Sequence, residues 1–263
     1  MKFLKQFKKN NSIPTLWYND IVLMKNSSLV EIGAMSGNIS FYAWKTFGTK
    51  NIYAVEAIPA HYEKLVSKFK ETPIQPVNVA IGDKNGEVSF FVYGLHSSSS
   101  LFDLDSHNKY SRELKVEEKI QVRSVTIETF MEEHKLKHIN CLIMNCEGAE
   151  EFILPQIVNS EKLITAIDQI SIELHPMILG QRRILELIRL LWPHYECRVI
   201  TRNIRGPSNA IFTRRETPTT TQLPYFILQH TYAAVMDALW PILRYLKNQA
   251  LNFTSKEAIR KSL

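Results

Sequence analysis

The chain has 263 residues, 45% of them hydrophobic, which gives room for one α/β domain with a sizeable core and an appended segment. Its three cysteines exclude a disulfide framework and suit a reducing cytoplasm. The formal net charge of +6 and the pI near 9.1 favour anionic partners such as nucleic acid, anionic glycans or a membrane surface, although ordinary solubility charge explains them as well.

Residues 1–27 form a basic N-terminal extension in this interpretation. Residues 1–10 mix lysines with apolar side chains but lack the long apolar core of a signal peptide, so we expect a cytoplasmic protein. The same pattern suits a short amphipathic helix resting on a surface, which leaves peripheral membrane contact open. A helical run is expected to continue to about Lys25. An uninterrupted apolar run of about 18 residues, which would predict a membrane-spanning helix, does not occur in the sequence.

A strand–turn–helix pattern is the most informative feature of the chain. An apolar strand over residues 29–32 runs into a turn that holds Gly33 and Gly37 and opens a helix. A second apolar strand, over residues 51–56, ends in Glu56. In a parallel α/β sheet such an acid lies at the tip of the strand beside the turn, where it can accept both hydroxyls of a ribose. The pattern therefore predicts an adenosine-containing cofactor.

The glycine spacing narrows the choice of cofactor. A dinucleotide fingerprint needs Gly-x-Gly-x-x-Gly, so that the backbone can approach a pyrophosphate. Here Met35 and Asn38 stand where further glycines would be, and only Gly37 supports a tight turn. The spacing thus argues against a nucleotide-sugar or NAD enzyme. The pattern Glu-x-Gly-x-x-x-Gly, which starts at Glu31, is similar to motif I of class I S-adenosylmethionine (SAM) methyltransferases.

The elements that follow continue the alternation of helices and strands. A helix begins near Pro59, a strand follows over residues 74–80, and an edge strand over residues 87–93 pairs with residues 119–125. The polar loop 94–117 between that pair is long enough to predict a wall of the cofactor or substrate site. The buried side of the helix is expected to consist of Tyr62, Leu65, Val66 and Phe69.

The second half of the domain completes the predicted sheet, and its final strand should be antiparallel. The expected elements are a helix capped by Thr126 and reaching about Leu136, strands over residues 139–145 and 168–174, a helix over residues 179–191, and a closing strand pair over residues 195–201 and 208–213.

Residues 216–263 are predicted to form a linker and a helical tail. Residues 217–224 are rich in Thr and Pro, which is typical of a linker. Residues 225–263 combine apolar and basic side chains at helical spacing, with a kink or end expected at Pro241. Such a tail packs on its own domain, dimerises or lies on a membrane. We favour the first, and the oligomeric state stays open.

Several blocks of the sequence stand in a fixed order. They are residues 31–37, Val79-Ala80-Ile81-Gly82-Asp83, Ser97 to Leu101, residues 139–150 ending in Asn145-Cys146-Glu147-Gly148-Ala149-Glu150, and residues 170–176 ending in Glu173-Leu174-His175-Pro176. Together these blocks resemble the FkbM-type SAM-dependent methyltransferase family, and the resemblance covers roughly residues 28–215. Met35 stands where that family usually has Asn, and Ile143 and Asn145 stand where it usually has Lys and Asp.

The resemblance implies an α/β fold of the class I methyltransferase type over residues 28–215: a Rossmann-like, doubly wound, seven-stranded sheet with an antiparallel last strand. It implies SAM as cofactor and methyl transfer to a hydroxyl of a sugar, glycolipid or small metabolite. Glu31 should lie beside the amino-acid end of SAM, and backbone N–H groups at the turn should face the ligand. Ala80 and Ile81 should flank adenine. The expected cofactor-binding residues are Glu31, Gly33, Ala34, Gly37, Glu56, Ala80 and Ile81.

Methyl transfer to a hydroxyl needs a group that removes or weakens its proton. The candidates lie at neighbouring strand ends: His175, which has the most suitable pKa, with Glu147 and Asn145. His175 equally suits a structural role as a strand-end cap, and Glu147 equally suits an orienting role at the next helix. Asn145, Glu147 and Glu173 would also suit Mg²⁺, but we expect no metal because Asn replaces the usual acid.

Two other functions remain as alternatives. A nucleic-acid methyltransferase would fit the net positive charge of the chain, but the sequence has neither an Asn-Pro-Pro-Tyr type base-flipping motif nor a separate RNA-binding module. A catalytically inactive SAM-binding scaffold would fit the departures at Met35 and Asn145.

Overall fold

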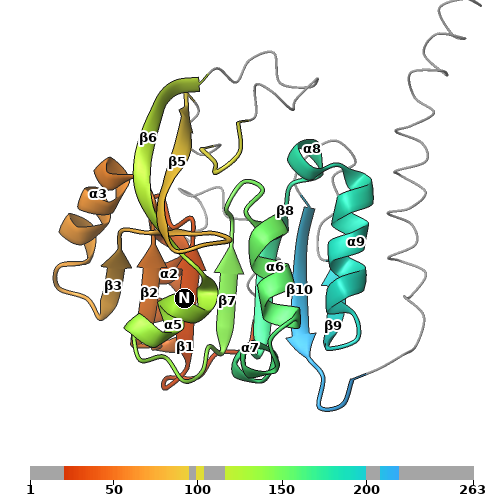
Figure 1. Ribbon diagram of the computed structural model, residues 1–263. Coiled ribbons are helices and arrows are strands. Elements are labelled where there is room, and N and C mark those ends of the chain that lie inside the picture. The colour runs from red at the N-terminus through yellow and green to blue at the C-terminus, as the bar shows by residue number, and fades with distance from the viewer. Residues whose placement is uncertain (1–20, 95–98, 104–115, 200–207, 219–263) are drawn as a thin grey trace, which may run out of the picture. The chain divides into compact units, whose positions relative to one another are not determined.

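A seven-stranded sheet with the strand order β3-β2-β1-β7-β8-β10-β9 organises the domain (Figure 1). This computed structural model describes residues 21–94, 99–103, 116–199 and 208–218. Neighbours from β3 to β8 pair in parallel, whereas β10 is antiparallel to both β8 and β9, which confirms the predicted doubly wound sheet. The strands are β1 (Ser28–Ile32), β2 (Asn51–Val55), β3 (Ile74–Val77), β7 (Cys141–Met144), β8 (Gln169–Leu174), β9 (Tyr195–Val199) and β10 (Ser208–Arg214).

Helices cover both faces of this sheet. One face packs Leu29, Ile52 and Ala54 against α2 and α3, in a core that also includes Leu65 and Phe69. The alternate residues of the strands face the other way, where Figure 1 shows α5, α6 and α9 in front of the sheet. The helices are α2 (Asn38–Phe47), α3 (Pro59–Phe69), α5 (Ile127–Glu133), α6 (Glu150–Val158), α7 (Glu161–Ala166), α8 (Pro176–Leu179) and α9 (Gln181–Leu191).

A second, three-stranded sheet with the order β4-β6-β5 stands at the carboxyl side of the first. Its strands are β4 (Ala80–Ile81), β5 (Gly86–Tyr93) and β6 (Val116–Val125), and β5 pairs with β6 along its whole length, as predicted. The prediction of a single strand over residues 74–80 is wrong, because the structure has two strands, β3 and β4, with Asn78 between them. The side-chain amide of Asn78 donates to the carbonyls of Glu56 and Ala57, and the chain turns there from one sheet to the other.

Some helix predictions also need correction. Residues 21–25 are not helical, and Val22 instead exchanges two backbone hydrogen bonds with the Gln169 side chain. On α3, His61 is buried whereas Val66 is 43% exposed. The helix expected over residues 179–191 is observed as α9 and begins at Gln181, because Gly180 has a φ of +80° that no regular helix accommodates. The predictions for residues 1–20 and for the tail from residue 219 onward lie outside the described residues.

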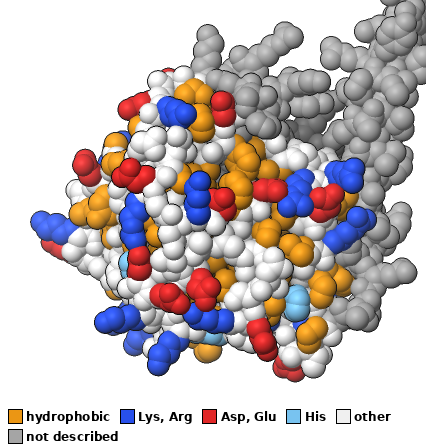
Figure 2. All heavy atoms as spheres, in the orientation of Figure 1, with side chains coloured by type: hydrophobic (Ala, Val, Ile, Leu, Met, Phe, Trp, Pro, Cys, Tyr) orange, Lys and Arg blue, Asp and Glu red, His pale blue; other side chains and the backbone are white. Residues whose placement is uncertain are grey.

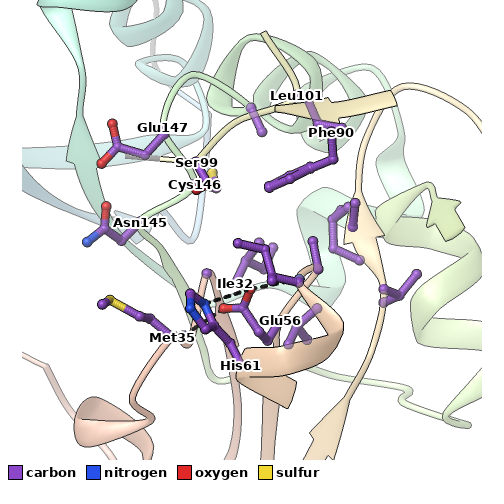
Figure 3. A pocket seen from close by; sticks show the side chains of 18 residues that line it. Ile32, Met35, Glu56, His61, Phe90, Ser99, Leu101, Asn145, Cys146 and Glu147 are labelled. Carbon is purple, nitrogen blue, oxygen red and sulfur yellow. Dashed lines mark hydrogen bonds and ion pairs between the residues drawn. The ribbon is translucent and has the colours of Figure 1, made fainter. Parts of the chain in front are cut away.

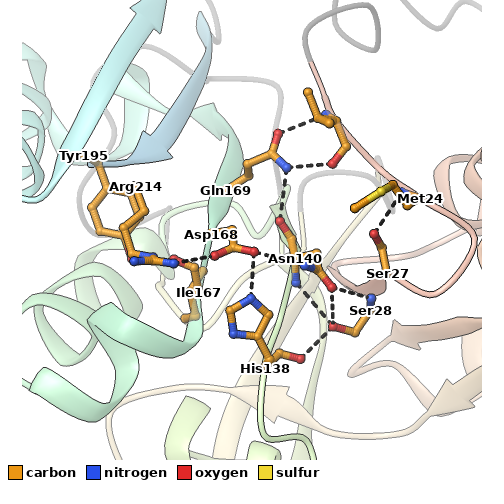
Figure 4. Close-up of polar contacts among 11 residues, drawn as sticks. Met24, Ser27, Ser28, His138, Asn140, Ile167, Asp168, Gln169, Tyr195 and Arg214 are labelled. Atoms are coloured by element: carbon orange, nitrogen blue, oxygen red, sulfur yellow. Dashed lines mark hydrogen bonds and ion pairs between the residues drawn. The ribbon is translucent and has the colours of Figure 1, made fainter. Parts of the chain in front are cut away.

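A polar network ties the strands together at the edge of the sheet where β7 and β8 begin (Figure 4). Asp168 is its centre: Arg214 donates to one carboxylate oxygen at 2.8 Å, while Asn140 at 3.0 Å and His138 Nε2 at 2.6 Å contact the other. Burial alone would raise the pKa of Asp168, but the Arg214 and His138 contacts outweigh it and lower that pKa. The network connects β7, β8 and β10 at one end of these strands, which stabilises their relative positions. A site at the opposite ends of the strands would therefore have a rigid support.

The surface and the helices add two observations. On the face seen in Figure 2, basic and acidic side chains are interspersed, as expected for ordinary solubility charge. Within the part of the chain that the structure describes, we find no helix long and apolar enough to cross a membrane.

Candidate functional site

A cavity of about 660 Å³, open solvent included, lies where β1, β2 and β7 end (Figure 3). One part of its wall is apolar, and the other part carries polar side chains. The apolar wall includes Ile58, Val79, Ala80, Ile81, Phe90 and Leu101, and the polar wall includes Glu56, His61, Ser99, Asn145, Cys146 and Glu147.

The turn after β1 lies against the turn after β7. Gly33 lines the cavity with a φ of +79°, and a Cβ at this position would lie 2.0 Å from the carbonyl oxygen of Asn145. Two other residues of the turn, Ala34 and Gly37, are buried and do not line the cavity. The amides of Gly33 and Ala34 both donate to the carbonyl of Val55, and that of Gly37 donates to Ala34. The sequence predicts that the N–H groups at Ala34 and Gly37 face the ligand. In the structure, both amides already donate to carbonyl groups of the protein.

Replacing Gly33 with Ala is expected to lower the free energy of unfolding by more than about 3 kcal/mol, because positive φ and a backbone clash combine. Gly180→Ala is the matched control, since Gly180 has a φ of +80° but no atom within 4 Å of the position that a Cβ would take. Urea unfolding of both variants measures the difference. Equal losses of stability would show that the close approach to Asn145 is not what requires glycine.

Glu56 lines the polar wall, as the strand-end prediction required, and is 5% exposed. Its two carboxylate oxygens accept from the amides of Met35 and Ile58, at 2.8 and 2.9 Å. His61 Nδ1 lies 3.8 Å from one of them, and Figure 3 shows this imidazole beside the carboxylate. Each oxygen accepts one backbone hydrogen bond and keeps a further lone pair, so the fixed carboxylate is able to accept two hydroxyls.

Glu31 has a different environment from the one expected. Its carboxylate is 3% exposed and accepts from both the amide and the hydroxyl of Ser40 in α2, and it is not among the residues that line the cavity. The sequence predicts it beside the amino-acid end of the cofactor, whereas the structure turns it toward the start of α2. Burial raises the pKa of Glu31 to about 7, against the lowering effect of the Ser40 hydrogen bonds.

Glu31 should give the stability of the fold a defined pH dependence. Its pKa rises from 4.5 to about 7 on folding, so the folded state binds this proton more tightly than the unfolded state. The resulting stabilisation is complete below pH 4.5 and is lost as the pH rises to about 7. We expect the stability difference between wild type and Glu31→Gln to change by about 3 kcal/mol across this range. Urea unfolding at both ends of the range measures it, and a constant difference would contradict the buried protonated carboxyl.

His175 is held between two carboxylates. It is 6% exposed, its Nδ1 lies 2.7 Å from Glu150 and its Nε2 lies 3.3 Å from Glu147. Burial disfavours the imidazolium, but the charges and hydrogen bonds of Glu150 and Glu147 outweigh it, and the pKa of His175 is raised well above its usual value. An imidazolium has no lone pair to accept a proton, and His175 does not line the cavity. The geometry therefore argues against the predicted general base.

Glu147 and Asn145 do line the cavity, on the side across from Glu56 and His61 (Figure 3). Glu147 has a φ of +46°, and the side-chain oxygen of Asn145 is buried with no hydrogen-bond partner among the described residues. Glu173 lies close by, and burial together with the charges of Glu147 and Glu150 raises its pKa despite the opposing charge of His175. In the described part of the chain, no group of three or more His, Cys, Asp or Glu side chains is placed to hold a metal ion.

Two residues, His61 in the cavity wall and Ser100 next to it in the chain segment that lines it, had no individual role in the sequence-based predictions. His61 is in the first turn of α3, which begins at Pro59 shortly after Glu56. The position of this imidazole near Glu56 is therefore predictable once the start of α3 is known. Ser100 belongs to a serine run in the long loop, where sequence alone does not say which hydroxyl is buried. In the structure, Ser100 is fully buried and donates to the carbonyl of Glu147.

Comparisons with known proteins agree with this architecture. The family described as Methyltransferase FkbM domain matches residues 31–198. Among solved structures, methyltransferase FkbM from Methylobacillus flagellatus KT is similar, with a TM-score of 0.53 and 12% identity over 75% of this chain and 47% of that chain. The match thus spans about half the length of that relative, and it supports the fold alone.

Two further structures are similar at a lower level. An uncharacterized protein from Listeria monocytogenes serotype 4b has a TM-score of 0.45 and 11% identity over 95% of this chain and 84% of that chain. TrmK from M. capricolum, solved with S-adenosylhomocysteine, has a TM-score of 0.40 and 12% identity over 84% of this chain and 72% of that chain. No curated protein sequence matches the chain significantly.

Proposed function

This chain belongs to the FkbM family of SAM-dependent methyltransferases, and from that premise we propose that it transfers a methyl group to a hydroxyl of a sugar, glycolipid or small metabolite. The family fixes the cofactor as SAM. To this we add the residues that hold the cofactor, the group that takes up the proton, and the class of acceptor.

The cavity supports a specific way of holding SAM. Glu56 would accept the two ribose hydroxyls, because its carboxylate is already fixed by the amides of Met35 and Ile58. The apolar wall with Ala80 and Ile81 would flank the adenine ring. Gly33 would allow the amino-acid part of the cofactor to pass close to the turn after β1, while Ala34, Gly37 and Glu31 shape that turn from behind.

The polar residues opposite Glu56 would carry the chemistry. When bound, SAM supplies an electrophilic methyl group on a sulfonium. Glu147 would accept the hydroxyl proton as the acceptor oxygen forms its bond to the methyl carbon and the carbon–sulfur bond breaks. Asn145, whose side-chain oxygen is buried with no partner in the described part of the chain, would accept a hydrogen bond from the acceptor and orient it.

His175 would act on Glu147 rather than on the acceptor. An imidazolium beside a carboxylate favours the ionised form of that carboxylate and restricts its orientation. With Nε2 at 3.3 Å from Glu147 and Nδ1 at 2.7 Å from Glu150, His175 would keep the base charged and in place. We therefore replace the expected general base with a positioning residue.

One observation carries the proposal: two carboxylates, Glu56 after β2 and Glu147 after β7, line the same cavity. In the proposal, the first would accept the ribose hydroxyls and the second would act as the base at the other end of the same ligand. Burying a carboxylate has a high desolvation cost, which favours a functional reason for the buried Glu56 in this wall.

A methyl-transfer screen tests the proposal. The purified chain and a Glu147→Gln control are incubated with methyl-labelled SAM and separate panels of glycans, glycolipids, small hydroxyl-bearing metabolites and RNA. We expect label in a hydroxyl-bearing acceptor, in a linkage stable to mild base as an ether is, and much less label with the variant. Label confined to RNA would support the nucleic-acid alternative. Binding of SAM without transfer to any panel would support the inactive scaffold.

A further inference from the structure

The backbone of Glu147 is in a conformation that its side chain does not favour. Among the described residues, Met35, Lys135 and Glu147 are the non-glycine residues with positive φ, and the first and last of these line the cavity. Positive φ costs conformational free energy in a residue with a Cβ and persists only where surrounding contacts enforce it. Something must therefore hold Glu147 in this conformation at the cavity wall.

Ser100 supplies that contact on the backbone side. Its Oγ donates to the carbonyl oxygen of Glu147 at 2.5 Å and accepts from the amide of Phe102 at 3.0 Å, so the direction of the hydroxyl hydrogen is fixed. Ser100 is fully buried, and its own amide and carbonyl pair with Phe91 of β5 at 3.0 and 2.8 Å. The hydroxyl is thus anchored to the second sheet and reaches across to the turn after β7.

The residues around Ser100 make this contact specific. Ser99 and Leu101, on either side of it, line the cavity, and the ring of Phe102 stacks on Phe152 of α6 with centroids 5.1 Å apart. The same Phe102 ring closes the space beside Gly148, where an added Cβ would lie 3.0 Å from it. The peptide that joins Glu147 to Gly148 is therefore enclosed, and its carbonyl depends on Ser100 for a donor.

We infer that Ser100 is a positioning residue for Glu147: its hydroxyl holds the backbone of the base while His175 holds the side chain. The inference rests on the role of Glu147 in the proposed function. Without the Ser100 hydroxyl, the buried carbonyl would have no donor among the described residues, the peptide would rotate, and the carboxylate would move away from His175 Nε2.

Titration of His175 tests this arrangement without needing an acceptor. Histidine-labelled protein is titrated by NMR, with the His175 signal assigned by its loss in His175→Gln. In Ser100→Ala we expect the pKa of His175 to fall by at least about half a unit, because one of its two carboxylates has moved. Ser100→Thr, which keeps a hydroxyl, should titrate as wild type. Ser89→Ala is the matched control, since it removes only an exposed hydrogen bond to Gln121 on the same sheet.

Two further measurements separate positioning from general stability. Calorimetry with S-adenosylhomocysteine should give dissociation constants within about threefold of wild type for every variant, because the cavity wall that binds the nucleoside is retained. With an acceptor from the screen, Ser100→Ala should lower kcat about tenfold or more with little change in the KM for SAM. Ser100→Cys, a weaker donor of similar size, should fall between Ala and wild type and serves if the Ala variant does not fold.

An unchanged His175 titration in Ser100→Ala, or in Ser100→Cys if only that variant folds, would overturn the inference, even if the unfolding midpoint falls. The proposed function is tested separately. A negative methyl-transfer screen would contradict the function, whereas the titration of His175 requires no methyl transfer.

Discussion

Glu147→Gln is expected to reduce methyl transfer by about 100-fold or more while leaving the affinity for S-adenosylhomocysteine within about threefold. Glutamine has nearly the same shape but accepts no proton from the acceptor hydroxyl. The residue lies on the cavity wall and is held by Ser100 and His175, so the substitution should leave its position unchanged. Steady-state kinetics with the acceptor found in the screen, together with calorimetry, measure the two quantities.

The matched control for this prediction is Glu151→Gln. Glu151 is in the first turn of α6 and forms an ion pair with Arg183 at 2.7 Å, away from the cavity lining. The substitution removes an equal charge from the same part of the chain and should leave turnover nearly unchanged. Full activity of Glu147→Gln would exclude Glu147 as the base and leave alignment of the acceptor as the source of catalysis.

The pH dependence distinguishes Glu147 from His175 as the base. A histidine base would make the rate rise with pH through the imidazole range. Because the charges and hydrogen bonds of Glu150 and Glu147 raise the pKa of His175 well above its usual value, we expect it to stay protonated through the usual imidazole range. The rate should then show no rise from His175 in this range. An NMR titration that deprotonates His175 near neutral pH would contradict the assignment.

Glu56→Ala is expected to weaken SAM binding by about 2–3 kcal/mol, which is roughly 30- to 150-fold in the dissociation constant. The variant would lose both proposed bonds to the ribose and also release the amides of Met35 and Ile58. Calorimetry with SAM gives the affinity, and circular dichroism checks that the fold survives. Glu63→Ala is the control, because Glu63 is an exposed acid on the same helix, α3. An unchanged dissociation constant in Glu56→Ala would require the cofactor to bind elsewhere.

The sequence was sufficient for the fold because apolar runs and turn signals specify the sheet. The strands of the parallel sheet are buried on both faces, so they read as continuous apolar segments, and their ends were found to within a few residues. Glu56 was predictable for the same reason, since an acid directly after such a strand must lie at the carboxyl edge. The division of this part of the chain into β3 and β4 was not predictable from the sequence, because it depends on a side-chain contact of Asn78 with the backbone after β2.

The roles of Glu31 and His175 show where sequence reasoning stops. Both follow or end strands of the central sheet, so motif position predicts that they reach the ligand. Their actual directions depend on partners distant from them in sequence: Ser40 donates to the Glu31 carboxylate, and Glu150 holds the His175 imidazole at 2.7 Å. Whether a histidine is a neutral base or an imidazolium depends on such neighbours, which spacing alone does not reveal.

A crystal structure of the chain with S-adenosylhomocysteine tests the central claim most directly. We predict the ribose hydroxyls within hydrogen-bond distance of Glu56 and adenine against the apolar wall with Ala80 and Ile81. The sulfur should lie on the side of the cavity that carries Asn145 and Glu147. A ligand bound outside this cavity, or with its sulfur far from Glu147, would contradict the proposed site.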